Sequence, residues 1–451
     1  MDITEILLPP LYLVIIITIA IRYSSKHKKK NSAYNYFMPG LLIKMFGAVA
    51  LGLTYFFYYK GGDTINYYYT ACSFVDVLLE RPDDFMYLYF GNPQFADYAL
   101  LNSKYEFTYW INDAYAFFVC KCFTPILLIT FKSYFTAAIV VAAICYLGVW
   151  RLFLVFLSEF PHLEKLFVWS ILYVPSVVFW GSGLMKDSIT FSSASIYVHG
   201  FYWFFTQRRY KLKYAVALFI GAYFLISIKP YILFALLPGS ILWFFSLRMA
   251  KVKSVLIKIF FAPALIFIGI TVGLFALQQL GDSLGKYSMD KVIKTASGAQ
   301  QDLKQAYYAG NSFDIGDYEP TPSGMLSVSH KAIFATLFRP TFLDVQNVVM
   351  ALCAIENTFI LGFSIYLLFK LKVYRFFLLI TDSPLLLFSF IFSMFFAFSV
   401  GVSISNFGAM VRLKIPCIPF FLSSLVILND QINQAARKNY KLSKKFDREE
   451  E

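Results

Sequence analysis

The sequence predicts an all-α polytopic membrane protein with about eleven transmembrane helices. The composition gives two reasons for this class. Hydrophobic residues make up 59% of the 451 positions and charged residues only 15%, and the mean hydropathy of +0.61 is well above that of an ordinary soluble domain. Aromatic residues make up 20%, which suits lipid-facing helices whose ends lie among the headgroups.

Apolar runs of about 17–25 residues, the length that crosses the hydrocarbon core of a bilayer, recur along the chain. The runs lie at 7–23, 37–59, 134–157, 166–184, 188–206, 213–228, 231–248, 255–279, 347–370, 383–401 and 412–429. A further run at 115–131 is interrupted by Lys121 and Pro125, and we interpret it as an interfacial or re-entrant helix. Counting it as a full span would export the basic loops that follow, against the positive-inside rule.

Lysine and arginine gather in short clusters between the apolar runs, such as RRYKLK at 208–213 and RMAKVK at 248–253. Because positive charge is retained on cytoplasmic loops, these clusters predict an N-terminus outside and a C-terminus in the cytoplasm. The predicted cytoplasmic loops are 24–35, 158–165, 208–213, 249–254 and 371–382. The same clusters explain the formal charge of +13, so no nucleic-acid partner is expected.

Residues 1–430 are predicted to form one transmembrane domain, and residues 431–451 a cytoplasmic tail that is first basic and then acidic. Two long loops, 61–133 and 280–346, are expected on the outer face. The six cysteines lie mostly in or beside apolar segments and lack the ligand spacing of a zinc site. With no HExxH, no DxD in the outer loops and no P-loop, the sequence predicts neither a metal site nor a cofactor.

Isolated polar residues interrupt the apolar background, and the predicted orientation brings them to the outer face. They are Asp63, Lys186, Asp187, Lys229, His330, Arg339, Asp344, Glu356, Asn406 and Arg412. Lys229 and Arg339 lie on the side opposite to the basic loops, so orientation does not explain them. Glu356 lies roughly two to three turns inside its span, where an ionised carboxylate is costly unless it meets a cation or a cavity.

Simpler structural roles remain open for several of these residues. Lys186 and Asp187 can form a neutral pair that closes a tight helical hairpin. Glu356 can be satisfied by one of the basic residues, Asn406 can cap a helix, and His330 can lie on the surface.

Several cations and a few carboxylates at one outer face suit the chemistry of a phosphate-bearing ligand. Lysine binds phosphate as a point charge, and arginine binds it as a bidentate fork. A membrane enzyme meets phosphate on this face chiefly as a polyprenyl-linked phosphate or diphosphate. In a glycosyl transfer, a carboxylate would act as general base on the acceptor hydroxyl while cations stabilise the departing diphosphate.

Four stretches of the sequence carry a resemblance to known proteins. They are VPSVVFWGSGLMKDS at 174–188, FRPTFLDVQNVVMALCAIEN at 338–357, NFGAMVRLKIPCIPF at 406–420, and GGDTINYYY at 61–69. The first three resemble motifs of polytopic membrane proteins of bacterial polysaccharide biosynthesis. The fourth is similar to a segment of the O-antigen and exopolysaccharide polymerase group, whose architecture is related to the C-type glycosyltransferases.

This resemblance implies functional roles for specific residues: Asp63, Lys186, Asp187, Arg339, Glu356, Asn406 and Arg412. The chain departs from the pattern at two places. Three residues, 341–343, precede Asp344, where the motif commonly has an earlier acidic residue. Lys414 stands where the third motif often has a second arginine, which keeps the charge but loses the bidentate fork.

The leading hypothesis is therefore a membrane glycosyltransferase or oligosaccharide-repeat polymerase. It would act on undecaprenyl-diphosphate-linked oligosaccharides at the outer face of a bacterial inner membrane, with other polysaccharide-assembly proteins as candidate partners. The donor diphosphate would be held by Lys186, Lys229, Arg339, Asn406 and Arg412.

The same hypothesis gives the carboxylates separate roles. Asp63 or Asp187 would be the acceptor base, and Glu356 would orient the arginines. The segment 280–330 would gate the sugar cleft. Two alternatives remain, a flippase or exporter of the same lipid-linked oligosaccharide and a non-catalytic subunit of an envelope complex.

Overall fold

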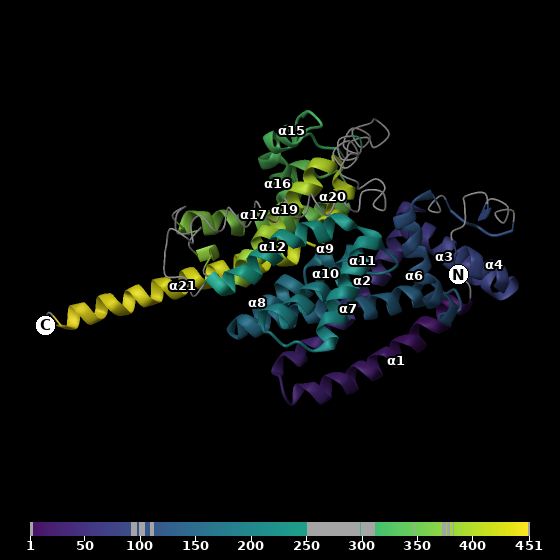
Figure 1. Ribbon diagram of the computed structural model, residues 1–451, viewed down its shortest axis with the longest axis horizontal. Helices are drawn as coiled ribbons and strands as arrows, with labels where there is room; N and C mark the ends of the chain where they lie inside the picture. Colours follow the sequence, from purple (N-terminus) through teal and green to yellow (C-terminus); the bar gives the residue numbers. More distant parts are fainter. Residues whose placement is uncertain are drawn as a thin grey trace. The chain divides into compact units, whose positions relative to one another are not determined.

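The long apolar runs fold into helices in the computed structural model of the chain (Figure 1). The structure describes residues 3–91, 97–98, 104–108, 112–249, 298, 312–346, 348–371, 376, 379–381 and 383–449. Secondary structure within these residues is helical, apart from an isolated antiparallel bridge between Ser312 and Asn406. The predicted all-α class is confirmed for this part of the chain.

Five helices in the described part are long and apolar enough to cross a membrane. They are Ile3–Lys28, Ser32–Tyr59, Tyr134–Glu159, Met350–Lys370 and Pro384–Ser403. A sixth span is possible if Phe407–Leu413 and Ile418–Ala436, which meet at 67°, form one bent span. The helices therefore indicate a multi-pass membrane protein.

The predicted count of eleven spans is not confirmed, because several apolar runs fold into shorter or broken helices. The run 166–184 contains Pro175, which starts the short helix α9 (Pro175–Trp180) after an irregular turn. The runs 213–228 and 231–248 form apolar helices separated at Pro230, Leu212–Ile228 and Pro230–Ser246, which are shorter than a full span. The predicted run 255–279 lies outside the described residues.

The chain divides into two compact units, each described here by itself. Unit 1 comprises Met1–Leu154, Leu172–Phe201 and Tyr210–Pro230. Its helices are α1 (Ile3–Lys28), α2 (Phe37–Leu53), α3 (Asp63–Glu80), α4 (Pro82–Phe90), α6 (Ala114–Ile129), most of α7 (Tyr134–Glu159), α9, α10 (Lys186–Phe201) and α11 (Leu212–Ile228).

Helices α10 and α11 pack closely in unit 1 because glycine lies at their contacts. A Cβ added to Gly200 would come 2.6 Å from the amide nitrogen of Leu218. A Cβ added to Gly221 would come 2.7 Å from the carbonyl oxygen of Ser193. Small residues allow this approach of two backbones in membrane helices.

The described part of the predicted outer loop 61–133 contains three α-helices with a largely aromatic core of their own. The core brings together α3, α4, α6 and the segment between them, with the buried residues Phe74, Val77, Phe85, Leu88, Tyr98, Tyr105, Phe107 and Phe117. Helix α6 corresponds to the ambiguous run 115–131, and Asp113 caps its first turn by accepting hydrogen bonds from the amides of Tyr115 and Ala116. The charge of Lys121 inside α6 is met by the carbonyl oxygen of Tyr89, 2.6 Å away.

Unit 2 comprises Val155–Ile171, Tyr202–Arg209 and Tyr231–Glu451. Its main elements are α12 (Pro230–Met249), α15 (Pro322–Ser327), α16 (Ser329–Phe338), η9 (Phe342–Asp344), α17 (Val348–Lys370), α19 (Pro384–Ser403), α20 (Phe407–Leu413) and α21 (Ile418–Glu449). Helix α16 packs on α19, where Thr336 donates a hydrogen bond to the carbonyl oxygen of Ala397 at 2.9 Å. Helix α21 continues into the predicted tail 431–451 as far as Glu449.

The first helix is attached to α7 by a carboxylate. Glu5 of α1 accepts hydrogen bonds from the amides of Tyr134 (2.6 Å) and Phe135 (3.2 Å) and from the hydroxyl of Ser133 (3.0 Å). These groups lie at the start of α7, where amide hydrogens have no partner within the helix. A carboxylate there is also favoured by the helix dipole.

We expect Glu5→Ala to lower the free energy of unfolding by about 1–2 kcal/mol, because the amides of Tyr134 and Phe135 lose their acceptor at the start of α7. Thermal unfolding of the purified protein in detergent measures this loss. Thr18→Ala is the matched control, since the Thr18 hydroxyl bonds only within α1, to the carbonyl oxygen of Val14. An equal loss of stability in both variants would contradict the capping role.

Candidate functional site

The Lys186-Asp187 doublet lies in the first turn of α10, directly after a break in the chain. Helix α9 ends at Trp180, and Gly183 in the connecting turn has a φ of +75°, a conformation that glycine adopts without strain. The start of a helix favours a carboxylate such as Asp187. The sequence around the doublet thus forms a helical break with two charges at its exit.

Asp187 and Lys229 form a buried ion pair in unit 1. Lys229 lies at the end of α11, and its Nζ is 2.5 Å from Oδ1 of Asp187. Asp187 is 1% exposed and Lys229 is 6% exposed. Asp187 is a predicted base and Lys229 a predicted phosphate ligand. Each neutralises the charge of the other, which makes their burial possible.

Lys186 points to a different partner. Its Nζ is 3.8 Å from Oδ2 of Asp113, the residue that caps α6, and it lies 5.9 Å from the ring centroid of Tyr67 on α3. Each member of the doublet therefore has a partner from a distant part of the chain. Asp113 could not be predicted as a partner, because in the sequence it is an ordinary loop aspartate.

Asp63 is the first residue of α3 and is half-buried. It follows Gly61 and Gly62, whose φ angles are +153° and +114°, so the two glycines turn the chain into the helix. Tyr67, one turn later, contacts Lys186. Unit 1 therefore contains four of the predicted site residues: Asp63, Lys186, Asp187 and Lys229.

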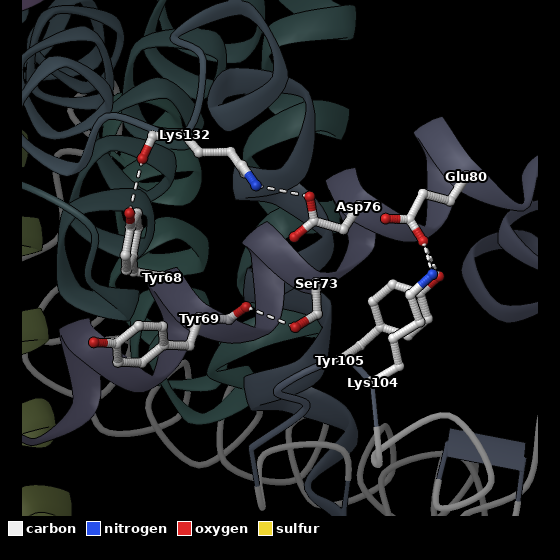
Figure 2. Close-up of polar contacts among 8 residues, drawn as sticks. All are labelled: Tyr68, Tyr69, Ser73, Asp76, Glu80, Lys104, Tyr105 and Lys132. Atoms are coloured by element: carbon white, nitrogen blue, oxygen red, sulfur yellow. Dashed lines mark hydrogen bonds and ion pairs between the residues drawn. The ribbon is translucent and has the colours of Figure 1, made fainter. Parts of the chain in front are cut away.

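Other charged residues of α3 are engaged in contacts within the same segment. Figure 2 shows Asp76 paired with Lys132 at 2.7 Å, and Glu80 bound by Lys104 and by the hydroxyl of Tyr105. These contacts attach the carboxyl-terminal half of α3 to the segments at residues 104–105 and 130–133. We interpret them as structural.

Arg339 is the centre of the polar cluster in unit 2. It follows the last turn of α16, and its Nε and Nη2 both donate hydrogen bonds to the carboxylate of Asp344. The guanidinium also lies over two aromatic rings, 5.5 Å from the centroid of Phe313 and 4.9 Å from that of Phe407. These contacts fix the orientation of the Arg339 guanidinium.

Asp344 is itself fixed by the turn that contains it. The amide and the hydroxyl of Thr341 donate to its Oδ2 at 2.7 and 2.9 Å, forming a capping box for η9. Burial alone would raise the pKa of the Asp344 carboxyl, but the hydrogen bonds from Arg339 and Thr341 hold this pKa below its ordinary value. The carboxylate is therefore ionised and remains paired with Arg339 at neutral pH.

A cavity of about 410 Å³ opens beside Arg339 within unit 2. Its lining residues are Asp314, Ile315, His330, Lys331, Phe334, Ala335 and Arg339. A guanidinium has five N–H donors, so the two bonds to Asp344 leave three, including an end-on pair that suits two oxygens of one phosphate. The cavity combines this donor with a second cation, Lys331, and a carboxylate, Asp314.

The remaining predicted residues of unit 2 lie around this cluster. Asn406 caps α20 by accepting a hydrogen bond from the amide of Ala409 at 3.1 Å, as the simpler structural role predicts. Arg412 lies in the last turn of α20, and Glu356 lies on α17, both half-buried. The structure adds Lys414, which is buried beside Arg339 and which sequence reasoning treated only as a weaker arginine.

The eight predicted site residues thus form two groups, one in each unit, with Arg339, Glu356, Asn406 and Arg412 in unit 2. The roles predicted for the individual residues remain predictions. Among the described residues, no three His, Cys, Asp or Glu side chains are placed to hold a metal ion. Most of the predicted gating segment 280–330 lies outside the described residues.

We expect Lys229→Met to lower the free energy of unfolding by roughly 3–5 kcal/mol, because Asp187 would stay buried without its ammonium partner. Adding Asp187→Asn should restore part of this loss, because the amide carries no charge. Chemical unfolding of the single and double variants in detergent measures both effects. A double variant whose losses simply add would contradict the coupling.

The low pKa of Asp344 predicts an acid-sensitive contribution to stability. A carboxyl whose pKa is lowered by folding stabilises the protein fully above the unfolded value of about 3.9, and this contribution is lost as the pH falls through the folded pKa. The unfolding midpoint of Asp344→Asn should therefore fall less steeply below about pH 4 than that of the unmodified protein. Asp83→Asn, at an exposed aspartate, should retain the steep fall.

Comparison with known proteins does not identify a family for this chain. No protein-family model, no curated protein and no solved structure matches it. The motif resemblance to the polymerase group therefore stays a prediction. The helices indicate a polytopic all-α membrane protein.

Proposed function

We propose that this protein is a membrane glycosyltransferase of the oligosaccharide-repeat polymerase type. Its substrates would be polyprenyl-diphosphate-linked sugars at the outer face of a bacterial inner membrane, used in the assembly of a cell-surface polysaccharide. The observation that carries the proposal is the cavity of unit 2, whose lining residues include Arg339, Lys331, Asp314 and His330.

The setting of Arg339 supports a phosphate ligand. Asp344 takes two of its donors, and the rings of Phe313 and Phe407 lie against the guanidinium. The donors that remain are directed by this arrangement before any ligand arrives. Donors that are fixed in advance lose little freedom on binding, and a site with aromatic walls strengthens their attraction for an anion.

The packing of α16 supports a ligand that is half lipid. This helix supplies His330, Lys331, Phe334 and Ala335 to the cavity wall, and it packs on α19, a candidate membrane span. A polyprenyl tail among the membrane helices would leave its diphosphate near the end of α16. The cations then meet the leaving group while the tail stays in apolar surroundings.

The reaction needs a base as well as cations. The oxygen of an acceptor sugar hydroxyl attacks the anomeric carbon of the donor, the bond from that carbon to the diphosphate oxygen breaks, and the bonding electrons leave with the diphosphate. The hydroxyl proton passes to a carboxylate. Asp314 is the carboxylate among the residues that line the cavity, and we propose it for this role.

The carboxylates that the sequence suggested as bases, Asp63 and Asp187, belong to unit 1. Asp187 is buried and paired with Lys229, which favours a structural role for that pair. Lys186 is partly exposed beside Asp113 and remains the unit 1 residue that we propose as a further phosphate contact.

We expect Arg339→Ala to slow chain extension by roughly 100-fold to 1,000-fold, because the departing diphosphate loses its directed donor. The assay is growth of an oligosaccharide ladder from lipid-linked repeat units by the purified protein in liposomes. Arg81→Ala is the matched control, since Arg81 pairs with Asp84 on the surface of unit 1.

Extension by Arg339→Ala at the unmodified rate would contradict the proposed function. Movement of the lipid-linked sugar across the liposome membrane, with no extension by the unmodified protein, would favour a flippase instead.

A further inference from the structure

The backbone that carries Arg339 is held by two buried polar residues. Lys414 Nζ donates to the carbonyl oxygen of Arg339 at 3.2 Å and to the side-chain oxygen of Asn357 at 2.8 Å. The side-chain nitrogen of Asn357 in turn donates to the carbonyl oxygen of Pro340 at 2.9 Å. Two consecutive carbonyl groups, on either side of Pro340, are thus bound by one connected network.

Both residues are almost completely buried. Lys414 and Asn357 are each 1% exposed. They come from distant elements, Asn357 from the third turn of α17 and Lys414 from the end of α20. The network therefore joins α17 and α20 to the turn that follows α16.

A buried ammonium is costly unless it is hydrogen-bonded and balanced by charge. Lys414 has two neutral acceptors in the network, and the half-buried Glu356, next to Asn357, attracts it electrostatically. Lys414 is absent from the residues that line the cavity. Its ammonium contacts the main-chain carbonyl of Arg339 and not the guanidinium-bound carboxylate of Asp344.

We infer that Lys414 and Asn357 are positioning residues for Arg339. They fix the main chain of residues 339–340 while Asp344 fixes the guanidinium, so that the remaining donors of Arg339 face the cavity at a constant place. The inference rests on the proposed function, in which Arg339 binds the donor diphosphate. It gives a role to Lys414, which stands where the third motif often has a second arginine.

The position of Arg339 can be tested without any substrate. Phenylglyoxal modifies arginine side chains, and mass spectrometry of the full-length protein in detergent gives the rate at each arginine. We expect Asn357→Leu and Lys414→Met to label Arg339 severalfold faster than the unmodified protein, because its guanidinium would leave the contacts with Asp344 and the two rings more often.

Two controls separate this effect from general loosening of the fold. Ser364→Ala removes another buried polar group of α17, one that bonds only within the helix to the carbonyl oxygen of Ile360, and it should leave the Arg339 rate unchanged. Arg81, whose side chain is 52% exposed, serves as a reference within each sample. An unchanged Arg339 rate in both Asn357→Leu and Lys414→Met would overturn the inference.

A milder variant covers the case in which these substitutions unfold the protein. Asn357→Asp keeps an acceptor for Lys414 and gives it a charged partner, but it loses the donor to the Pro340 carbonyl. If Asn357→Leu and Lys414→Met also raise the labelling rate of Arg81, Asn357→Asp becomes the decisive variant. Faster labelling of Arg339 with an unchanged Arg81 rate in Asn357→Asp supports the positioning role. An unchanged Arg339 rate in this variant contradicts it.

Binding of farnesyl diphosphate, a short polyprenyl diphosphate, separates this inference from the proposed function. We expect Asn357→Leu and Lys414→Met to weaken its binding by about 10-fold, because Arg339 would then have to be ordered when the ligand binds. If Arg339→Ala binds farnesyl diphosphate as tightly as the unmodified protein, Arg339 is not part of a phosphate site and the proposed function fails. The labelling rates of Arg339 still test whether Lys414 and Asn357 position its side chain. If Arg339→Ala loses binding but the two network variants bind normally, the positioning inference fails.

Discussion

The cost of placing charge among apolar side chains governs the polar architecture of this protein. Lys229 is buried against Asp187, and Lys414 against an amide and a carbonyl group. Lys44, buried in α2, has the carbonyl oxygen of Val177 at 3.5 Å and the ring of Phe191 near its ammonium. In each case the charge joins two different elements, because the acceptor it needs lies on another element. Because each buried charge needs a partner, these ion pairs and hydrogen bonds hold specific elements in contact.

The helices themselves were largely predictable, because long apolar runs have few other stable conformations in a bilayer. The N-terminal run and the run at 134–157 appear in the structure as long helices close to their predicted limits. Hydropathy alone did not predict the helices correctly at two places. Pro175 breaks the predicted span 166–184 and starts the short helix α9, and the described part of the loop 61–133 contains helices that share a largely aromatic core.

The predicted site residues could be identified from the sequence because charged residues stand out from an apolar background. The residues that they contact could not be identified in this way. Asp113 looks like any loop aspartate in the sequence, yet its carboxylate pairs with the ammonium of Lys186. The charge of Glu356 makes it conspicuous in the sequence, whereas the neighbouring neutral Asn357 makes the hydrogen bonds to Lys414 and Pro340. Such pairings depend on tertiary structure, and a single sequence contains no direct signal for a contact between residues that lie 57 positions apart.

The carboxylate of Glu5 has a consequence for how the chain is assembled in the membrane. Its partners lie 128–130 residues further along, at the start of α7. During synthesis α1 therefore enters the bilayer well before its docking site exists, and its apolar face, still exposed at Leu11 and Val14, meets lipid in the meantime. Insertion of α1 and its attachment to the bundle are separate events, in the order expected when membrane helices first insert and then associate. The hydrogen bonds of Glu5 can therefore form only after residues 133–135 have been synthesised.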